Sequence, residues 1–353
     1  MRAIAVSAFG AEPRPVEVPK PDPGPGDVRV KVDYAALNPL DREPWAHVAD
    51  EADPSAYPLV LGADFAGRVD MIGPGDNRFR VGDPVFGRVG RPTRGCGAYS
   101  EYVCVAQDSP VALVPRDLPL PLAAALPTAG MTAAQILDGT AVRNSRSLLV
   151  IGAAGGVGGF LTQLAAARGI TVVAAVRGDE NRRMKELGAT VTVDTSRADG
   201  ALEVAVRELC PSGADSLADL VSTGPAAFAA HAALLRAGGV AVTTRGVAAP
   251  PGVAWVDFRI APTAALLDEL AAAAARGELS VPVVMQLPLE KAPQALAQNR
   301  AGGARGKTVF SVRTDGHDTR RTPIGAAATA GTAAHRAGRG TWATRTSSRA
   351  STS

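Results

Sequence analysis

The sequence predicts an α/β protein in which a β-rich first part precedes a doubly wound parallel sheet. Before residue 120, short segments that alternate apolar and polar residues, such as residues 28–32 (VRVKV), are separated by glycine- and proline-rich turns. Residues 147–151 and 171–176 are continuous apolar runs, which are typical of parallel strands buried on both faces. A glycine-rich turn and a helix-spaced apolar pattern lie between these runs, which gives the order strand, helix, strand.

The expected elements follow in order along the chain. In the first part, strands at residues 28–32, 67–72, 81–87 and 99–105 predict a small β-barrel or sandwich. Residues 120–137 are rich in alanine and leucine and predict a helix. The α/β part continues with strands at residues 190–193, 217–222 and 240–244, and with helices at residues 179–187 and 226–235. A helix at residues 264–276 and strands at 281–284 and 307–312 indicate that the last part folds back onto the first.

Composition indicates a globular protein of two domains with a separate basic tail. The chain has 353 residues, of which 46% are hydrophobic, and a net charge of +3. Residues 313–353 carry seven arginines against two aspartates, so this tail contributes +5 and the rest of the chain −2. The body therefore has no bias towards nucleic acid or membranes. The tail is too poor in large apolar residues to fold, and the alternative role for it is nucleic-acid binding.

Cysteine content and hydropathy indicate the compartment. Cys96, Cys104 and Cys210 form no CxxC pair, and three cysteines cannot all be paired, which favours a reducing compartment. No segment approaches the roughly 20 apolar residues of a membrane span, and the N-terminus lacks a signal-peptide pattern. We therefore expect a cytoplasmic protein.

The strongest chemical signal is the glycine-rich turn LLVIGAAGGVG at residues 148–158. Between a buried strand and a helix, one glycine permits the bend, one admits a pyrophosphate, and one lets the helix pack on the strand. The helix N-terminus adds free N–H groups and partial positive charge for phosphate. The alternative is a glycine turn that only packs. The residues expected to bind a dinucleotide are Gly152, Ala153, Gly155, Gly156, Val157 and Gly158.

The end of the second parallel strand decides which dinucleotide is bound. An acid there would bind the ribose 2′-hydroxyl of NADH, whereas an arginine favours the 2′-phosphate of NADPH. Arg177 takes the strand-end position, and Arg182 and Arg183 follow about one helical turn later. We therefore expect NADPH. The alternative is that these arginines only solvate a helix that also carries Asp179 and Glu180.

Five motifs, in this order and spacing, resemble the zinc-independent quinone oxidoreductase branch of the medium-chain dehydrogenase/reductase superfamily, over residues 1 to about 312. They are VLGADFAGRV at 60–69, VGDPVFG at 81–87, LPTAGMTA at 126–133, IGAAGGVG at 151–158 and RGKTVF at 305–310. The resemblance implies a GroES-like β-barrel catalytic domain, a Rossmann-type NADPH-binding domain, and reduction of a quinone or an α,β-unsaturated carbonyl. It also implies a homodimer through the edges of the Rossmann sheet. We place the catalytic domain at residues 1–125, completed by 261–312, and the NADPH-binding domain at 126–260.

Zinc-dependent relatives in this superfamily have a cysteine in the stretch that matches residues 37–41 and Gly-His-Glu at residues 62–64. This chain has LNPLD and GAD there, and it lacks the four-cysteine lobe of those relatives. We therefore expect no metal site. Asp64 takes the position of the glutamate, and we expect a structural carboxylate paired with a nearby arginine or with backbone N–H groups.

Without a metal, the protein must orient the nicotinamide and the acceptor, and a hydrogen-bond donor must stabilise the developing enolate. The resemblance places an asparagine near the substrate at Asn38, where its amide would polarise a carbonyl. The alternative for Asn38 is a cap of the turn before Pro39. Asp41 and Tyr57 are further catalytic candidates, Tyr57 as a proton donor, and structural roles are the alternatives for both.

The resemblance also implies cofactor contacts outside the glycine turn. Thr128 and Thr132 match the family's turn beside the nicotinamide and phosphates, and Gly246 ends a strand where the nicotinamide lies. Arg305 and Lys307 match the closing R-G-K, which faces either the cofactor or the surface. Two rival functions stay open: an enoyl reductase of polyketide or other secondary metabolism, and a catalytically silent NADPH-binding sensor or nucleic-acid-binding protein.

Overall fold

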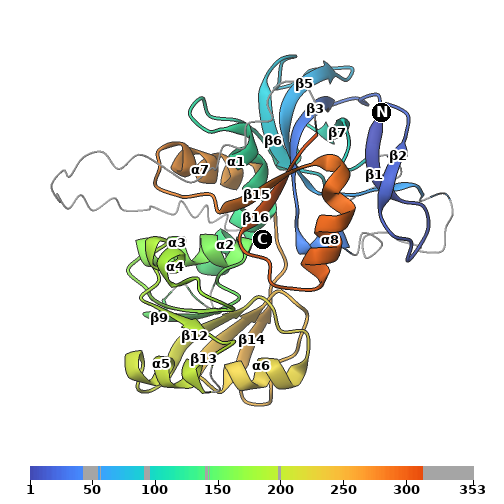
Figure 1. Cartoon of the computed structure of the whole chain (residues 1–353). Helices are drawn as coiled ribbons and strands as arrows, with labels where there is room; N and C mark the ends of the chain where they lie inside the picture. Colours follow the sequence, from blue (N-terminus) through green and yellow to red (C-terminus); the bar gives the residue numbers. More distant parts are fainter. Residues whose placement is uncertain are drawn as a thin grey trace, which may run out of the picture. The chain divides into compact units, whose positions relative to one another are not determined.

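The computed structural model describes residues 1–42, 55, 57–90, 96–139, 142, 144–197 and 200–312 (Figure 1). Residues 313–353, where the sequence predicts a disordered basic tail, lie outside the described residues. All the described residues belong to one structural unit. Within that part of the chain, no helix has the length and apolar character needed to cross a membrane.

A seven-stranded sheet holds most of the β-rich first part. Its order is β15-β16-β3-β5-β6-β8, and β7 pairs with β3. A smaller three-stranded sheet has the order β2-β1-β4. The core inside these sheets includes Phe65, Tyr99 and Phe310, and the rings of Tyr99 and Phe310 meet edge to face at 5.2 Å. The strands are β1 (Arg2–Val6), β2 (Arg14–Glu17), β3 (Asp27–Ala36), β4 (Leu59–Val60), β5 (Asp64–Ile72), β6 (Pro84–Arg88), β7 (Tyr102–Ala106), β8 (Val111–Leu113), β15 (Val283–Pro288) and β16 (Lys307–Ser311).

The C-terminal strands return to this N-terminal sheet, as the apolar pattern of residues 307–312 indicates. β16 pairs antiparallel with β3, so that Val309 lies opposite Ala36, and it pairs parallel with β15 on its other side. The N–H of Leu37 donates to the carbonyl of Thr308 at 2.9 Å, which extends the pairing past the end of β3. This register carries Lys307, the first residue of β16, to the segment that follows β3.

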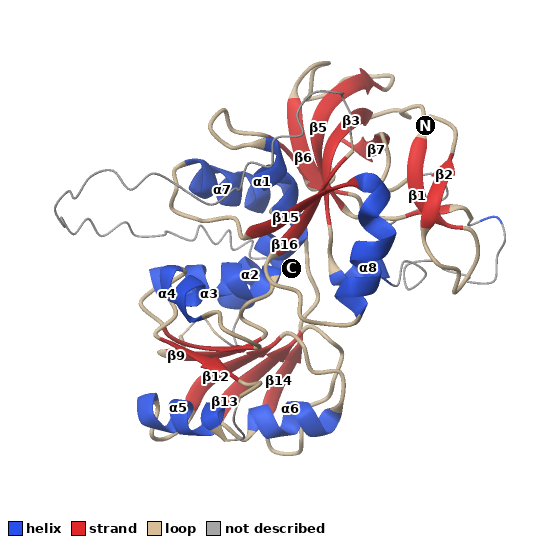
Figure 2. Ribbon diagram, viewed as in Figure 1, coloured by secondary structure: helices blue, strands red, loops and turns tan. Residues whose placement is uncertain are grey.

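The second sheet has six parallel strands in the order β11-β10-β9-β12-β13-β14. Every residue of β9 is buried, as expected for a central strand covered on both faces. Helices α3 and α4 lie on one face of this sheet, and α5 and α6 lie on the other (Figure 2). The fold is therefore a GroES-like β-barrel combined with a Rossmann-type doubly wound sheet. The strands are β9 (Ser147–Ile151), β10 (Thr171–Val176), β11 (Val191–Asp194), β12 (Ala214–Asp219), β13 (Leu235–Thr243) and β14 (Ala254–Asp257).

The helices follow the expected alternation, with two departures in this part of the chain. They are α1 (Leu120–Ala125), α2 (Pro127–Asp138), α3 (Gly156–Ala167), α4 (Asn181–Glu186), α5 (Ala201–Leu209), α6 (Pro225–Ala232), α7 (Ala264–Ala275) and α8 (Ala292–Arg300). The predicted helix at residues 120–137 is two helices, because Pro127 cannot donate a backbone hydrogen bond and starts a new helix. The apolar pattern did not predict α5 or α8.

Strand boundaries also differ from the sequence prediction, for example in β5 and β12. β5 begins at Asp64 rather than at Gly67, because Asp64 has buried partners that allow a carboxylate inside the strand. β12 spans Ala214–Asp219, whereas the prediction was residues 217–222. The prediction was shifted because β12 contains the buried polar residues Ser216 and Asp219, which an apolar pattern does not include. Five strands had no expected counterpart, namely β1, β2, β4, β8 and β14.

Candidate active site

The glycine turn after β9 has the backbone geometry that a closely approaching ligand needs. Gly152 has a φ of +83°, and a Cβ there would lie 2.5 Å from the Val221 side chain. A Cβ on Gly158 would lie 2.5 Å from the carbonyl oxygen of Gly152, so this glycine is needed for helix and strand to pack. Gly155 is the N-cap of α3 and offers no side chain, which leaves the start of the helix open to an anion.

The C-terminal R-G-K segment lies directly beside this turn. The N–H of Gly306 donates to the carbonyl of Ala154 at 2.7 Å, and Gly155 forms an isolated parallel bridge with Gly306. A Cβ on Gly156 would lie 2.7 Å from Cδ of Lys307. The absence of a side chain at Gly156 therefore makes room for the stem of Lys307.

Asp64 is the centre of a buried polar network. It is fully buried, and its Oδ1 accepts a hydrogen bond from the Thr128 hydroxyl at 2.6 Å. Its Oδ2 accepts from the backbone N–H of Thr128 at 3.1 Å and from Nδ2 of Asn38 at 2.9 Å. Arg88 does not pair with Asp64 directly, since its Nε donates to the Thr128 hydroxyl at 3.2 Å. The carboxylate thus links β5 to the first turn of α2.

Asn38 and Lys307 form the next part of this network, and both are buried. The Lys307 ammonium donates to Oδ1 of Asn38 at 2.6 Å and to the carbonyl of Leu37 at 2.8 Å. It lies 3.9 Å from Oδ2 of Asp64. Burial lowers the pKa of Lys307, and the nearby carboxylates of Asp64 and Asp41 act in the opposite direction. The ammonium is therefore directed towards Asn38 and Asp64.

Asp41 and Tyr99 complete the buried group. Asp41 lies in a short 3-10 helix (Pro39–Arg42), and its Oδ2 accepts from the backbone N–H of Asn38 and from the Tyr99 hydroxyl, both at 2.8 Å. Burial raises the pKa of Asp41 to about 6, and it also raises the pKa of Tyr99. Tyr57 is buried in the apolar core of the barrel, in the cluster that also includes Tyr99. The structure thus brings Asn38 and Asp41 together.

Comparison with known proteins agrees with this architecture. Residues 24–116 match the alcohol dehydrogenase GroES-like domain family, and residues 156–259 match the zinc-binding dehydrogenase family. The chain is 30% identical to a quinone oxidoreductase of Pseudomonas aeruginosa over 72% of this chain and 82% of that protein. The chain belongs to the quinone oxidoreductase branch of the medium-chain dehydrogenase/reductase superfamily.

Two plant members of the superfamily are also similar to this chain. The chain is 33% identical to a chloroplastic quinone oxidoreductase homologue of Spinacia oleracea and 31% identical to an NADPH-dependent alkenal/one oxidoreductase of Arabidopsis thaliana. These matches cover 57% and 65% of this chain, and only 63% and 58% of the two relatives.

Solved structures of the superfamily match nearly the whole described chain. A quinone oxidoreductase from Coxiella burnetii has a TM-score of 0.76 at 27% identity, over 89% of this chain and 99% of that one. A mycobacterial protein complexed with NADPH has a TM-score of 0.73 at 27% identity, over 88% and 99%. An NAD-dependent alcohol dehydrogenase has a TM-score of 0.78 at 28% identity, over 89% and 100%. The fold by itself therefore does not choose between NADPH and NADH.

A cluster of arginines surrounds a buried glutamate where β10 ends. Arg183 and Arg305 each pair with Glu180, at 2.7 and 3.0 Å, and Arg183 also donates to the carbonyl of Ala154 at 2.8 Å. Arg177 is exposed at the strand end. Arg182 points elsewhere, because it pairs with Glu186 and its side chain is 94% exposed. Arg183 was expected, like Arg182, to favour NADPH, and Glu180 was considered only as part of a solvated helix. The pairing of the buried Glu180 with Arg183 and Arg305 was not predicted.

The remaining predicted cofactor contacts lie around the same strand ends. Thr132 is buried one turn after Thr128 in α2, and Ala153 is buried in the glycine turn. Gly246 has a φ of +69° and follows β13, whose C-terminal end is on the same sheet edge as the end of β9. Val157 lies in the first turn of α3.

No group of three or more potential metal ligands occurs among the described residues. At the position of the zinc relatives' glutamate, Asp64 already has its oxygens bonded to Thr128 and Asn38. None of the three cysteines, all of which lie in the described residues, forms a disulfide, and burial raises the pKa of Cys104 to about 12, which keeps it protonated.

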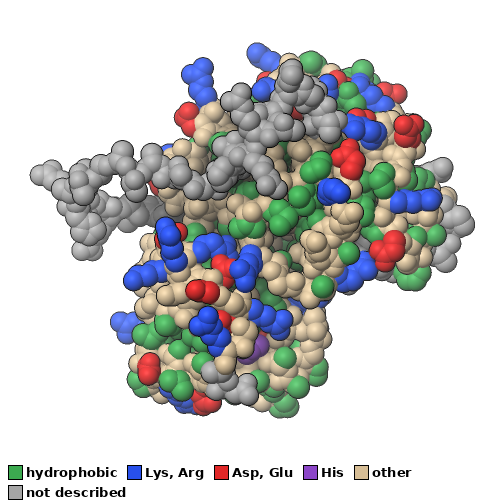
Figure 3. Space-filling model, viewed as in Figure 1, with side chains coloured by type: hydrophobic (Ala, Val, Ile, Leu, Met, Phe, Trp, Pro, Cys, Tyr) green, Lys and Arg blue, Asp and Glu red, His purple; other side chains and the backbone are tan. Residues whose placement is uncertain are grey.

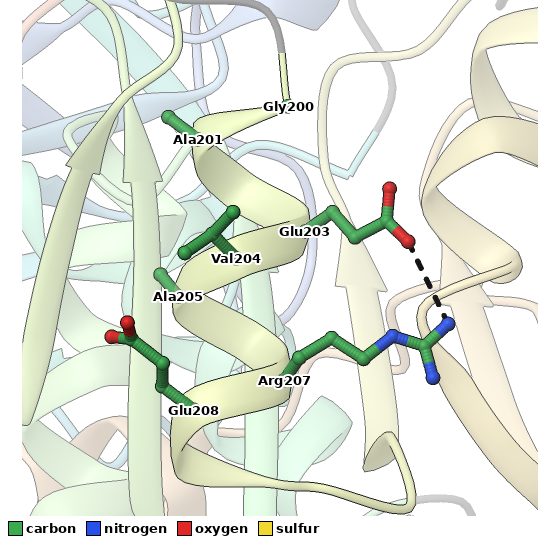
Figure 4. Close-up of a pocket in the computed structure, with 7 residues that line it drawn as sticks. All are labelled: Gly200, Ala201, Glu203, Val204, Ala205, Arg207 and Glu208. Carbon is green, nitrogen blue, oxygen red and sulfur yellow. Dashed lines mark ion pairs between the residues drawn. The ribbon is translucent and has the colours of Figure 1, made fainter.

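Two other polar features lie outside this network. A shallow hollow on the outer face of α5 is lined by Gly200, Ala201, Glu203, Val204, Ala205, Arg207 and Glu208 (Figure 4). Its only charged pair with a close contact is Glu203 and Arg207, at 3.7 Å, and no predicted site residue lines it. At the end of β12, Asp219 and Ser222 both contact Nδ1 of His231, so these three residues are not arranged as a nucleophilic triad.

Proposed function

We propose that the protein is an NADPH-dependent, metal-independent oxidoreductase that transfers hydride to a quinone or an α,β-unsaturated carbonyl. The observation that carries this proposal is the placement of the polar network of Asn38, Asp64 and Lys307 against the glycine turn. In that position a hydrogen-bond donor and a dinucleotide site adjoin each other. Relatives named as quinone oxidoreductase and alkenal/one oxidoreductase support this choice of acceptor.

The residues present fit a bound NADPH. Gly152, Gly155 and Gly158 leave the turn free of side chains, and α3 begins there without a side-chain cap. Within the described residues, Nη1 of Arg183 is buried without a hydrogen-bond partner. An orphaned guanidinium donor near the strand end is suited to a phosphate group. Arg177 and Arg305 add positive charge to the same region.

In the proposed reaction, the glycine turn would hold the pyrophosphate of NADPH, and the arginines at the end of β10 would hold its 2′-phosphate. When bound there, NADPH would supply the hydride from its nicotinamide. Asn38 donates a hydrogen bond to the acceptor carbonyl, which favours the developing negative charge on oxygen. Asp41 accepts hydrogen bonds from Asn38 and Tyr99 and holds the turn that carries Asn38.

The decisive experiment is NADPH oxidation with a panel of quinones, enones and an enoyl thioester. We expect turnover with quinones or enones, a preference for NADPH over NADH, and no loss of activity after dialysis against a chelator. Turnover restricted to the thioester would instead favour the enoyl reductase. Tight NADPH binding without turnover of any acceptor would refute the enzyme and favour the sensor.

We also propose a homodimer and a cytoplasmic location. The edge strand β14 pairs only with β13 in its sheet and exposes Trp255 and Val256, which are 38% and 40% exposed. An exposed apolar edge strand favours pairing with a second copy. The free cysteines fit a reducing compartment.

A further inference from the structure

Lys307 has an unexpected environment for the last residue of an R-G-K motif beside a dinucleotide site. Its side chain is 3% exposed, and its stem lies against Gly156 of the glycine turn. Its ammonium is bonded to the carbonyl of Leu37 and to Oδ1 of Asn38. Lys307 therefore connects the glycine turn to the residue proposed to bind the acceptor.

The orientation of the Asn38 amide is fixed by two charges. The Lys307 ammonium has only donors and requires the amide oxygen, whereas the Asp64 carboxylate has only acceptors and requires the amide nitrogen. A flipped amide would place its NH₂ against the ammonium and its oxygen against the carboxylate, and both contacts would be repulsive. The amide therefore has one allowed orientation.

This arrangement leaves one N–H group of Asn38 with only a long hydrogen bond. The first N–H donates to Asp64 at 2.9 Å, and the second has only a contact of 3.5 Å with the carbonyl of Ala36. A contact of that length is at the limit of a hydrogen bond. The second N–H can exchange it for an acceptor oxygen at little cost, and its direction is set by the two charged neighbours.

We propose that Lys307 is a positioning residue that, together with Asp64, locks the Asn38 amide with one N–H presented to the acceptor carbonyl. This inference rests on the proposed function for its catalytic consequence. It gives Lys307 a role towards the acceptor, in place of the cofactor contact or surface position that the resemblance of the R-G-K segment implied. If Lys307 acts on the acceptor, its substitution changes the acceptor kinetics. If it contacts the cofactor, its substitution changes NADPH binding.

The first test compares Lys307→Met with Lys291→Met, a change at an exposed lysine outside the site. We expect Lys307→Met to lower kcat/KM for the acceptor by about tenfold to a hundredfold, as for loss of a charged hydrogen bond, and to change the Kd of NADPH less than threefold. Lys291→Met should behave as the wild type. Weakened NADPH binding with unchanged acceptor kinetics would assign Lys307 to the phosphate and overturn the proposal.

A double-mutant cycle with Asn38→Ala tests whether Lys307 acts through Asn38. If it does, Lys307→Met has almost no further effect on kcat/KM once Asn38 is removed. Additive losses would show that Lys307 acts independently of Asn38 and would overturn the proposal. Lys307→Met leaves the Asp64 carboxylate without the positive charge of Lys307. Lys307→Met/Asp64→Asn therefore serves as a second variant that removes both charges, and it should show the same loss of kcat/KM.

A readout without turnover separates this inference from the proposed function. The side-chain amide signals of Asn38, assigned by their disappearance in Asn38→Ala, should be protected from hydrogen exchange in the full-length wild type. In Lys307→Met/Asp64→Asn they should exchange at least about tenfold faster, because neither charge then holds the amide. If the wild type turns over no acceptor, the proposed function fails, but this result still decides the orientation of Asn38. Equal protection in both proteins would overturn the inference.

Discussion

At the scale of single residues, the site is defined by how buried charges are balanced. Asp41, Asp64 and Lys307 are all at most 5% exposed, and they lie close enough to influence one another. Burial of an unpaired charge is costly, so each of these groups is bonded to polar neighbours. The resulting network leaves few polar groups free to bind a ligand.

Gly155→Val should abolish NADPH binding without unfolding the protein. Gly155 has an ordinary negative φ of −74°, and its Cβ would be 3.3 Å from the Gly152 carbonyl, so a side chain there requires that carbonyl to shift slightly but does not strain the backbone of Gly155. The side chain would stand where the pyrophosphate must approach. We expect a loss of affinity of about a hundredfold or more in titration calorimetry, which corresponds to about 3 kcal/mol, with little change in Tm.

Gly224→Val is the matched control for this substitution. Gly224 is also the N-cap of a helix, α6, with extended backbone and no atom within 4 Å of its Cβ position. It should bind NADPH as the wild type does. If Gly155→Val also retained binding, the glycine turn would not be the pyrophosphate site.

Arg177→Ala should weaken NADPH far more than NADH. Arg177 is exposed at the end of β10, next to the pairs that Arg183 and Arg305 form with Glu180. Loss of one charged contact to the 2′-phosphate should lower NADPH affinity about tenfold to a hundredfold. Fluorescence titration with both dinucleotides measures the ratio, and Arg182→Ala, which removes only an exposed pair with Glu186, should leave it unchanged. Equal losses of affinity for NADPH and NADH would show that Arg177 does not bind the 2′-phosphate.

Asp41→Asn should change how stability depends on pH. The pKa of Asp41 is raised from its ordinary 3.8 to about 6, so the native state holds more protons than the unfolded state between these values. Asp41 therefore makes the free energy of unfolding fall as the pH rises from about 4 to about 6. Asp41→Asn should remove this fall. The free energy of unfolding of the variant, relative to that of the wild type, should therefore increase by up to about 3 kcal/mol as the pH rises from about 4 to about 6.

Urea unfolding at several pH values between 4 and 7 measures this difference. Asparagine can present a carbonyl oxygen to the same two donors, so the fold of the turn should persist. The exposed Asp108→Asn serves as the control, and its difference from the wild type should not follow this curve. A constant difference for Asp41→Asn across pH 4–6 would contradict the raised pKa.

At the scale of elements, the position of each functional residue follows from strand register. β16 pairs with β3, and this register places Lys307 beside the residues that follow β3. β9 and its glycine turn are central in the parallel sheet, flanked by β10 and β12. The strands at the two edges of that sheet, β11 and β14, each have one neighbour. An edge that also exposes apolar side chains is a candidate interface.

Trp255→Glu on β14 should convert the proposed dimer into a monomer. Trp255 is 38% exposed on an edge strand, and a carboxylate there would have to be buried if two β14 strands met. Size-exclusion chromatography with light scattering measures the mass. The control is Val284→Glu on β15, another edge strand with an exposed apolar residue, which should leave the mass unchanged. A wild type that is already monomeric would refute the dimer.

At the scale of the whole molecule, charge is distributed between a nearly neutral body and a basic tail. On the visible face, basic and acidic side chains are interspersed over the surface (Figure 3). Mixed charge of this kind does not form the single-sign field that binds nucleic acid. The tail of residues 313–353, with seven arginines, carries the remaining positive charge.

Removal of residues 313–353 should leave NADPH oxidation unchanged. The described residues include every group assigned to the site, so activity does not need the tail. Full-length and truncated proteins should also show equally weak binding to DNA and RNA at several salt concentrations. If only the full-length protein bound nucleic acid, with an affinity that fell steeply with salt, the tail would be a nucleic-acid-binding segment.

Elements with a local apolar pattern were predicted better from the sequence than contacts between residues far apart in the chain. The strands at residues 147–151 and 171–176 match β9 and β10 because a strand buried on both faces is continuously apolar. β12 was misplaced because its buried Ser216 and Asp219 depend on partners that an apolar pattern does not reveal. The expectation that Asp64 pairs with backbone N–H groups agrees with its bond to Thr128. Its bond to Asn38 was not predicted.

The sequence by itself determined the central strands β9 and β10, the glycine turn and the superfamily, because each of these depends on local residue spacing. Only the tertiary structure decided which polar groups meet. Lys307 and Asn38 are 269 residues apart, and their bond exists because β16 pairs with β3 in one register. A hydrogen bond is short and directional, so a one-residue slip in that register would separate them. The partners of Asp64, and with them the orientation of Asn38, follow from that pairing.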